Sequence, residues 1–201
     1  MAPGITCFPT FPKLVCTVVK SSAANDDDLD RSLVQEYLNG KRSAGDELVN
    51  RYQRSVFNVA LRMLGNVQDA EDVTQTTFGN AFAALESYDP KFRFFSWIYR
   101  MTFNESLNTI KRRRNVVSLD GSFDVPAASG ASASADEAED RVGRALLDLK
   151  PDDRAVVILR HFVSFSYEEI SDVLGVPVKT VKSRLFTARE RMRQSLLVTS
   201  A

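Results

Sequence analysis

Residues 166–197 read SYEEISDVLGVPVKTVKSRLFTARERMRQSLL, and this stretch decides the fold of the C-terminal part of the chain. Ser166, followed three positions later by Glu169, predicts a capping box at the start of a short helix. Gly175 suits the turn after that helix, and Pro177 suits the entry to a second helix that continues to the end of the stretch. Two helices joined by a tight glycine-containing turn form a helix-turn-helix.

The second of these helices has two different faces. One face is an apolar stripe, expected to be buried, that consists of Val178, Val181, Leu185, Ala188, Met192 and Leu196. The opposite face is cationic, and Glu190 is the only acidic residue against it. A helix that is buried on one side and cationic on the other, in the second position of a helix-turn-helix, fits the DNA major groove. The alternative is an ordinary helix whose charged face is simply solvated.

Position along this helix predicts two kinds of DNA contact. The residues expected nearest to base edges are those at the helix start, namely Lys179, Thr180, Lys182, Ser183 and Arg184. Further along, Arg189 and Arg193 are expected to meet phosphates, and Phe186 shares the same DNA-binding face.

Composition excludes several other classes of protein. The chain has 201 residues, of which 44% are hydrophobic, and its 26 basic and 26 acidic residues cancel, so it can build packed cores but is not a uniformly basic coat. The two cysteines, Cys7 and Cys16, and the single histidine give no disulfide framework and no zinc site after residue 16. We expect no metal, no cofactor and a reducing, cytoplasmic compartment, with His161 packed or capping rather than ligating.

The periodicity predicts an all-α fold of two small helical domains joined by a flexible tether, the second containing the helix-turn-helix. Helical apolar stripes recur from about Leu29 to Arg114, beginning with Leu29, Leu33, Tyr37 and Leu38. The stripes then stop at a segment rich in Ser, Ala, Gly and Asp, DGSFDVPAASGASASA. The predicted boundaries are 1–25 for a disordered extension, 26–114 for the first domain, 115–137 for the linker and 138–197 for the second domain.

The extension resembles a signal peptide only superficially. It lacks a basic start, and Pro9 and Pro12 interrupt its apolar run. No later segment approaches the roughly 20 apolar residues of a membrane span. We expect residues 1–25 to be dispensable, and a redox switch between Cys7 and Cys16 stays an open alternative.

Several motifs together resemble one family. Residues 149–162 (LKPDDRAVVILRHF) and the helix-turn-helix resemble the C-terminal domain of extracytoplasmic-function sigma factors of the sigma-70 family, in which the second helix reads the −35 promoter element. The segments LRMLGN (61–66) and DAEDVTQ (69–75) resemble the part by which these factors grip the polymerase, and FSWIYR (95–100) resembles the stretch after the promoter-melting loop. The resemblance covers roughly residues 28–197.

The resemblance implies that the chain is a transcription initiation factor with three partners. These are core RNA polymerase (its β′ clamp and β flap), promoter DNA and an anti-sigma factor, with no small-molecule substrate. The polymerase contacts implied by the second motif are Gln68, Asp69, Glu71, Asp72 and Gln75. Helical spacing places most of these on one polar, acidic face that suits a basic partner, although a solvated helix surface has the same pattern.

The segment SYDPKFRF (87–94) is expected to hold the melted −10 element. Aromatic rings stack on unpaired bases and cations hold the strand. The residues predicted for this role are Tyr88, Lys91, Phe92 and Arg93. The alternative is that Phe92, Phe94 and Phe95 belong to the core, as we expect of some of them and of Trp97.

The sequence also departs from the family and leaves rival functions open. Thr76 and Thr77 follow Gln75 where the family usually has an acidic residue, which makes the contacts there uncertain. A stand-alone helix-turn-helix regulator is the main alternative. An enzyme with a DNA-binding tail is disfavoured because the chain has a single histidine, no nucleophilic triad and no glycine-rich phosphate loop.

Overall fold

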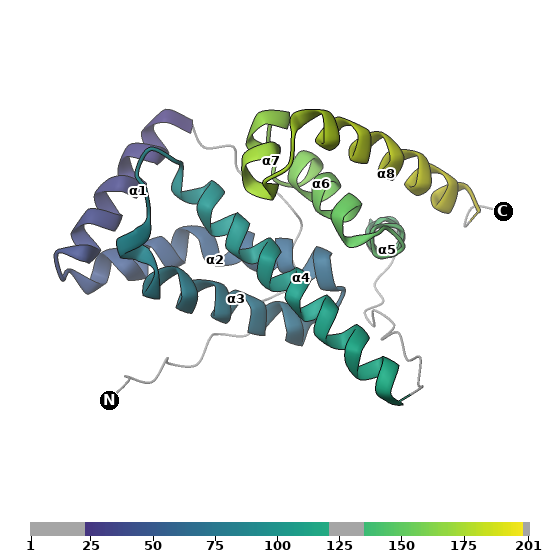
Figure 1. The fold of residues 1–201 in the computed structure, drawn as a ribbon, viewed down its shortest axis with the longest axis horizontal. Coiled ribbons are helices and arrows are strands. Elements are labelled where there is room, and N and C mark those ends of the chain that lie inside the picture. Colours follow the sequence, from purple (N-terminus) through teal and green to yellow (C-terminus); the bar gives the residue numbers. More distant parts are fainter. Residues whose placement is uncertain (1–22, 121–134, 199–201) are drawn as a thin grey trace.

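The computed structural model describes residues 23–120 and 135–198, and within these ranges all regular secondary structure is helical. The elements are α1 (Ala23–Leu38), α2 (Arg42–Leu64), α3 (Val67–Ala83), the short 3-10 helix η1 (Leu85–Ser87), α4 (Phe94–Asp120), α5 (Ala135–Leu147), α6 (Pro151–His161), α7 (Tyr167–Leu174) and α8 (Val178–Val198). Figure 1 shows α1–α4 as one group, with α5–α8 packed along it as a second group. The predicted all-α fold with two helical domains is therefore confirmed.

The first domain is a bundle of α1–α4 around an apolar core. Leu48 and Val56 of α2 and Ile98 of α4 are completely buried in it, and Phe78 of α3 is 8% exposed. Gly65 ends α2 with a φ of 69°, a left-handed conformation that glycine adopts without the steric penalty of a Cβ atom. This sharp ending lets the chain turn back at once into α3.

The second domain is built around α6. Pro151 occupies its first turn, where the missing N–H costs nothing. The apolar run 155–159 is buried without interruption, so that α6 has no solvated face at its centre. Helices α7 and α8 pack against it through Ile170 and Val181, which are both completely buried.

The predicted helix-turn-helix is confirmed by α7 and α8. The Ser166 hydroxyl accepts a hydrogen bond from the Glu169 N–H at 3.1 Å, and a Glu169 carboxylate oxygen accepts one from the Ser166 N–H at 2.7 Å. Gly175 makes the turn with a φ of 65°. On α8 the buried stripe contains Leu185 and Ala188, as the apolar spacing predicted.

The two domains share one apolar cluster. Met63 of α2 and Phe103 of α4 belong to it together with the second-domain residue Phe165. The centroid of the Phe165 ring lies 5.1 Å from that of Phe95 and 5.6 Å from that of Tyr99, both on α4. The sequence predicted two domains joined by a flexible tether and gave no sign of contact between them, but aromatic side chains from both domains pack against each other.

The ends of the helices differ from the predicted domain boundaries. Helix α1 begins at Ala23, inside the stretch 1–25 expected to be disordered, because Ala23 and Ala24 are strong helix formers that extend the helix ahead of its apolar stripe. Helices α4 and α5 extend into the predicted linker 115–137, to Asp120 and from Ala135. Lysine and arginine are good helix formers, so the basic run 111–114, where the first domain was expected to end, does not end α4. Residues 1–22 and 121–134 lie outside the described residues.

Helix α1 buries only part of the predicted stripe. Leu33 is 4% exposed and Tyr37 packs against the core, as predicted. Leu29 and Leu38 are instead 39% and 41% exposed, and Val34, which lies outside the predicted stripe, is 5% exposed. The inward face also carries Asp30, whose carboxylate accepts hydrogen bonds from Arg51 at 3.1 Å and from the Tyr52 hydroxyl. Burial raises the pKa of Asp30. A buried carboxylate with two donors on α2 replaces the apolar contact that the spacing predicted.

Candidate functional site

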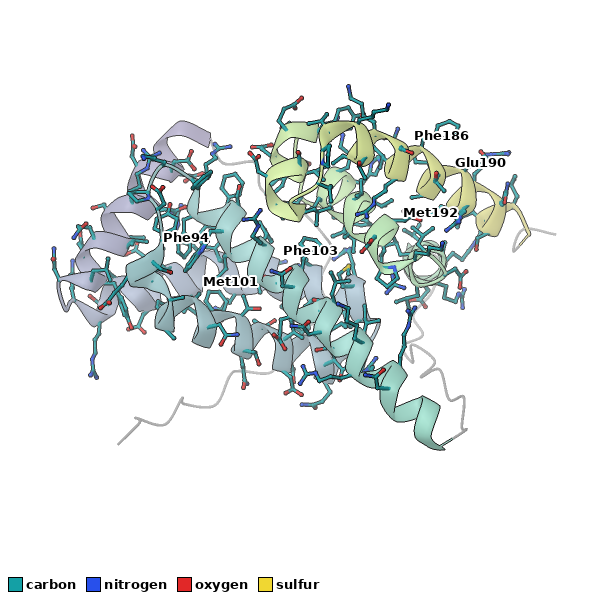
Figure 2. All side chains as sticks on the ribbon, viewed as in Figure 1. Phe94, Met101, Phe103, Phe186, Glu190 and Met192 are labelled. Atoms are coloured by element: carbon teal, nitrogen blue, oxygen red, sulfur yellow. The ribbon has the colours of Figure 1, made fainter. Side chains whose placement is uncertain are left out.

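The outer face of α8 presents cations and one large ring to solvent. Phe186 is 75% exposed and projects from the outer side of the helix, whereas Met192 lies on the inner side (Figure 2). The exposed polar and charged residues of the predicted −35 set are Lys179, Lys182, Ser183, Arg189 and Arg193. Because the apolar stripe on the other side is buried, the two faces of α8 are separated as the sequence predicted.

Arg184 and Thr180 are less accessible than the rest of the predicted −35 set. Both are half-buried, and Arg184 donates a hydrogen bond to an Asp152 carboxylate oxygen at 2.9 Å. Asp152 lies in the first turn of α6, so this ion pair ties α8 to the start of α6. A base contact by Arg184 would require exchange of this partner.

The cations further along α8 also have partners within the domain. Arg189 lies 3.3 Å from the His161 Nε2 atom, and Arg193 donates to Glu190 at 2.7 Å. Lys182 lies 5.5 Å from the centroid of the Tyr167 ring. Exposed pairs of this kind are weak, about 0.2–1 kcal/mol, so phosphates can replace them at little cost.

The segment between η1 and α4 contains the predicted −10 residues in three different environments. Tyr88 is 8% exposed, donates to the Phe92 carbonyl at 2.6 Å and meets the Phe94 ring edge-on, with centroids 5.7 Å apart. Burial raises the pKa of Tyr88 to about 12. Tyr88 therefore braces the loop from inside, whereas Phe92 is 60% exposed and Lys91 is also exposed. Trp97 packs against the same core, as expected.

Arg93 is held by two carboxylates from different parts of the chain. Its Nε donates to Asp27 of α1 at 2.6 Å, and its Nη1 donates to Glu169 of α7 at 2.7 Å. The guanidinium carbon also lies 4.6 Å from the centroid of the Phe95 ring. This predicted −10 cation, which directly precedes α4, is thus enclosed by α1, α7 and the first turn of α4.

The outer face of α3 carries most of the predicted polymerase contacts. The exposed ones are Gln68, Glu71, Asp72 and Gln75, and Thr76 is exposed beside them. Asp69 differs, because it is half-buried and forms an ion pair with Arg113 of α4. Its N–H donates to the side chain of Asn66, the N-cap of α3, at 3.0 Å. Asp69 therefore stabilises the start of α3 within the domain.

Comparison with known proteins identifies the family. The family models for Sigma-70 region 2 and Sigma-70 region 4 match residues 48–116 and 139–192. The chain is 32% identical over 181 residues to the RNA polymerase sigma-H factor of Pseudomonas aeruginosa, with 83% of this chain and 93% of the relative covered. It is 36% identical over 157 residues to the ECF RNA polymerase sigma factor SigE of Mycolicibacterium smegmatis, with 75% of this chain and 61% of that relative covered. The chain belongs to the extracytoplasmic-function group of the sigma-70 family.

As a sigma factor of this group, the chain directs RNA polymerase to promoters. Matches to both region 2 and region 4 disfavour the stand-alone regulator, and the family consists of transcription regulators rather than enzymes. Among solved structures, the sigma factor RpoE in complex with the anti-sigma factor NepR from Bartonella quintana aligns with a TM-score of 0.67 and 27% identity. The alignment covers 76% of this chain and 96% of that one.

Three residues connect the two halves of this sigma factor although the sequence did not predict it. They are Arg100, Arg154 and Glu169, of which Glu169 was predicted only as part of the capping box and not as a partner of Arg93. Arg154 could have been noticed as a charge inside the apolar run of α6, where a buried cation needs partners. The others could not, because their partners lie more than 70 positions away along the chain.

Within residues 23–120 and 135–198, no helix is long and apolar enough to cross a membrane. The same ranges contain no group of three or more His, Cys, Asp and Glu side chains that could hold a metal ion.

Proposed function

We propose that this sigma factor uses three separate surfaces during initiation. The outer face of α3 binds core polymerase through its β′ clamp, the segment 88–93 holds the melted −10 strand, and α8 reads the −35 element. The observation that carries this proposal is the separation of charge, with an acidic, polar face on α3 and a cationic face on α8. An acidic face repels DNA and attracts a basic protein surface, whereas a cationic face attracts DNA and repels a basic protein surface.

On α8 the proposal assigns base contacts to the helix start. An α-helix is about 10–12 Å wide and fits the roughly 12 Å major groove. Lys179, Lys182 and Ser183 are exposed where a recognition helix meets base edges, and Arg184 joins them on leaving Asp152. The exposed ring of Phe186 suits an apolar contact such as a thymine methyl group.

In the −10 segment, the roles that we propose for the individual residues differ from those predicted from the sequence. Phe92 provides the exposed ring for an unpaired base, and Lys91 and Arg93 supply cations for the strand. Tyr88 acts indirectly, because its buried ring and its hydrogen bond to the Phe92 carbonyl fix the shape of the loop.

We further propose that an anti-sigma factor regulates the chain, and that the chain acts in the cytoplasm together with the polymerase. The related RpoE structure holds an anti-sigma factor, which supports the first proposal. A protein that binds polymerase must share its compartment, which supports the second.

Reversal of one charge on α3 tests the polymerase surface. The variant Asp72→Lys should stay folded, because an exposed substitution usually costs within about 0.5 kcal/mol, yet it should bind core polymerase much more weakly. Asp46→Lys makes the same charge change at an exposed position on α2 and should bind like wild type. The measurement is a pull-down with core enzyme beside a thermal melt. Normal capture by folded Asp72→Lys would remove this residue from the interface.

A further inference from the structure

Helix α1 carries two adjacent rows of charged residues that contact different neighbours. Asp26 and Asp30, one helical turn apart, each accept a hydrogen bond from Arg51 of α2 at 3.1 Å. Asp27 and Arg31 form the next row at the same spacing, and they contact the segment that leads into α4 (Figure 1). Residues four positions apart lie on the same side of a helix, so one row attaches α1 to the bundle and the other faces the proposed −10 segment.

The row that attaches α1 to α2 is the better shielded of the two. Asp30 is completely buried, and the Tyr52 hydroxyl also donates to its carboxylate. The side chains of Asp26 and Arg51 are 28% and 26% exposed. A charge in such surroundings keeps its partner, because leaving it unpaired costs free energy. Helix α1 therefore has a fixed position from which its second row can contact the −10 segment.

The −10 segment forms a tight turn around Pro90. The Phe92 N–H donates to the Asp89 carbonyl at 3.0 Å, which closes a β-turn with proline in its second position. The Lys91 N–H donates to an Asp89 carboxylate oxygen, also at 3.0 Å. These two bonds set the local shape of the turn. The Pro90 carbonyl takes no part in them, and it accepts its hydrogen bond from α1.

Arg31 is the donor to this carbonyl. Its Nε donates to the Pro90 oxygen at 3.2 Å, and its Nη1 donates to an Asp28 carboxylate oxygen at 3.0 Å. The donors of a guanidinium have a fixed, planar arrangement, so the carboxylate of Asp28 orients the Nε edge toward the turn. The side chain of Arg31 is 44% exposed, so its replacement should leave the folded domain intact.

Helix α1 also contacts the end of the same segment. Asp27, whose side chain is 15% exposed, accepts the hydrogen bond from the Arg93 Nε at 2.6 Å. The contacts of α1 at Pro90 and at Arg93 therefore enclose Lys91 and Phe92, the two exposed residues proposed to meet the melted strand. The backbone that carries both side chains is thus attached to α1 on either side of them.

We propose that Arg31 is a positioning residue for −10 recognition, which fixes the turn at Pro90 and thereby presents Lys91 and Phe92 to the single strand. This inference rests on the −10 role proposed above for those two residues. A loop that already has its bound shape loses less conformational freedom when the strand binds, so its affinity is higher. Arg31 acts through the Pro90 carbonyl and does not itself bind the strand.

Two substitutions of Arg31 test its hydrogen bond to the turn. Arg31→Met keeps an unbranched apolar side chain but has no donor, whereas Arg31→Lys keeps a charged donor. Methionine, lysine and arginine have similar helix propensities, so α1 should stay folded in both variants, which a thermal melt verifies. Arg42→Met is the matched control, because it makes the same change at an exposed position at the start of α2.

Two measurements decide the outcome. The first is the affinity of the holoenzyme for a fluorescent 12-nucleotide single strand that the wild-type holoenzyme enriches from a randomised pool. It is repeated at several salt concentrations, because each direct phosphate contact adds about 0.7 to the salt slope on a single strand and a positioning contact adds nothing. The second is amide hydrogen exchange at Lys91 and Phe92 in the full chain, which reports how firmly the turn is held.

Arg31→Met should weaken binding by about three- to tenfold at every salt concentration, because apparent affinity scales with the fraction of molecules whose turn has the binding shape. Amide exchange at Lys91 and Phe92 should become faster in this variant. Arg31→Lys should recover most of the affinity, and Arg42→Met should match wild type. A smaller salt slope in Arg31→Met would show that Arg31 binds a phosphate directly, which would overturn its positioning role.

Phe92→Ala in the same assay separates failure of this inference from failure of the −10 role. Weaker binding by Phe92→Ala together with unchanged binding by Arg31→Met would overturn the positioning role of Arg31 alone. Unchanged binding by both variants would overturn the −10 role of the segment, and the positioning role with it.

Discussion

Two arginines on the outer side of α8 have different surroundings although they are only five positions apart. Arg184 is half-buried and paired with Asp152, whereas Arg189 is exposed beside His161. A guanidinium near the helix start can make a bidentate base contact, while one further along meets the DNA backbone. The structure therefore gives a physical basis for assigning them different roles.

Substitution of each arginine should separate these roles. Arg184→Ala should cost about 1–3 kcal/mol at one base position, because a single bidentate contact is lost. Arg189→Ala should weaken binding to all sequences alike and reduce the salt slope by about 0.9, the value for one phosphate contact. The measurement is holoenzyme binding to a promoter panel with each −35 base replaced, at several salt concentrations. Identical profiles for the two variants would contradict the division.

His161 should make stability depend on pH. Burial, followed by the nearby charges of Arg189 and Arg160, lowers the pKa of His161 below its usual 6.5. The unfolded chain then binds a proton more readily than the folded one, so this contribution to stability is complete above pH 6.5 and is lost as the pH falls through the lower, folded-state pKa. Wild type should lose stability relative to His161→Gln in thermal melts taken stepwise from pH 7.5 to about 5. A constant difference between the two proteins would contradict this prediction.

At the scale of elements, the capping box of α7 makes a measurable contribution. Ser166→Ala removes the hydroxyl that accepts the Glu169 N–H and should lower the free energy of unfolding by about 1 kcal/mol. Ser166→Thr keeps a capping hydroxyl and serves as the control. Chemical denaturation measures both. An unchanged free energy of unfolding in Ser166→Ala, or an equal loss in Ser166→Thr, would contradict the contribution assigned to the hydroxyl.

Helices and turns that depend on neighbouring residues in the sequence were predictable. Helices whose burial depends on contacts with residues far away in the sequence were predictable only in part. The box at Ser166, the turn at Gly175 and the stripe of α8 depend on residues within one or two helical turns, and all three appear in the structure. The inward face of α1 was assigned only in part, because Asp30 is buried through donors on α2 that periodicity cannot reveal.

The same distinction applies to the candidate site. The exposed faces of α3 and α8 follow from helical spacing, although Asp69, Thr180 and Arg184 of the predicted sets are half-buried. The burial of Tyr88 and the carboxylates around Arg93 depend on how separate helices pack. The sequence therefore could not distinguish a buried ring or a paired cation from a side chain that is free to bind DNA.

At the scale of the whole molecule, Arg154 joins the two domains. Its guanidinium donates to the Leu147 and Leu149 carbonyls of the second domain at 2.6 Å and 3.1 Å, and to the Met63 carbonyl near the end of α2. Burial lowers the pKa of Arg154 to about 10, which still leaves it charged near neutral pH. One buried cation therefore serves carbonyls near the ends of two helices, α2 and α5, that lie in different domains.

Removal of this cation should destabilise the molecule as a unit. Arg154→Ala leaves buried carbonyls without donors, at about 1–3 kcal/mol for each one that water cannot reach. Arg154→Lys keeps the charge but not the planar set of donors, so it should recover only part of the loss. Arg54→Ala, an exposed position on α2, should change stability by less than about 0.5 kcal/mol.

The measurement is a calorimetric melt of each full chain. Because the domains share an apolar cluster, wild type should melt in one cooperative transition that Arg154→Ala shifts downward. The contrary result is two resolved transitions in wild type, of which Arg154→Ala shifts only the one at lower temperature. That result would show that each domain unfolds independently and that Arg154 stabilises only the second domain.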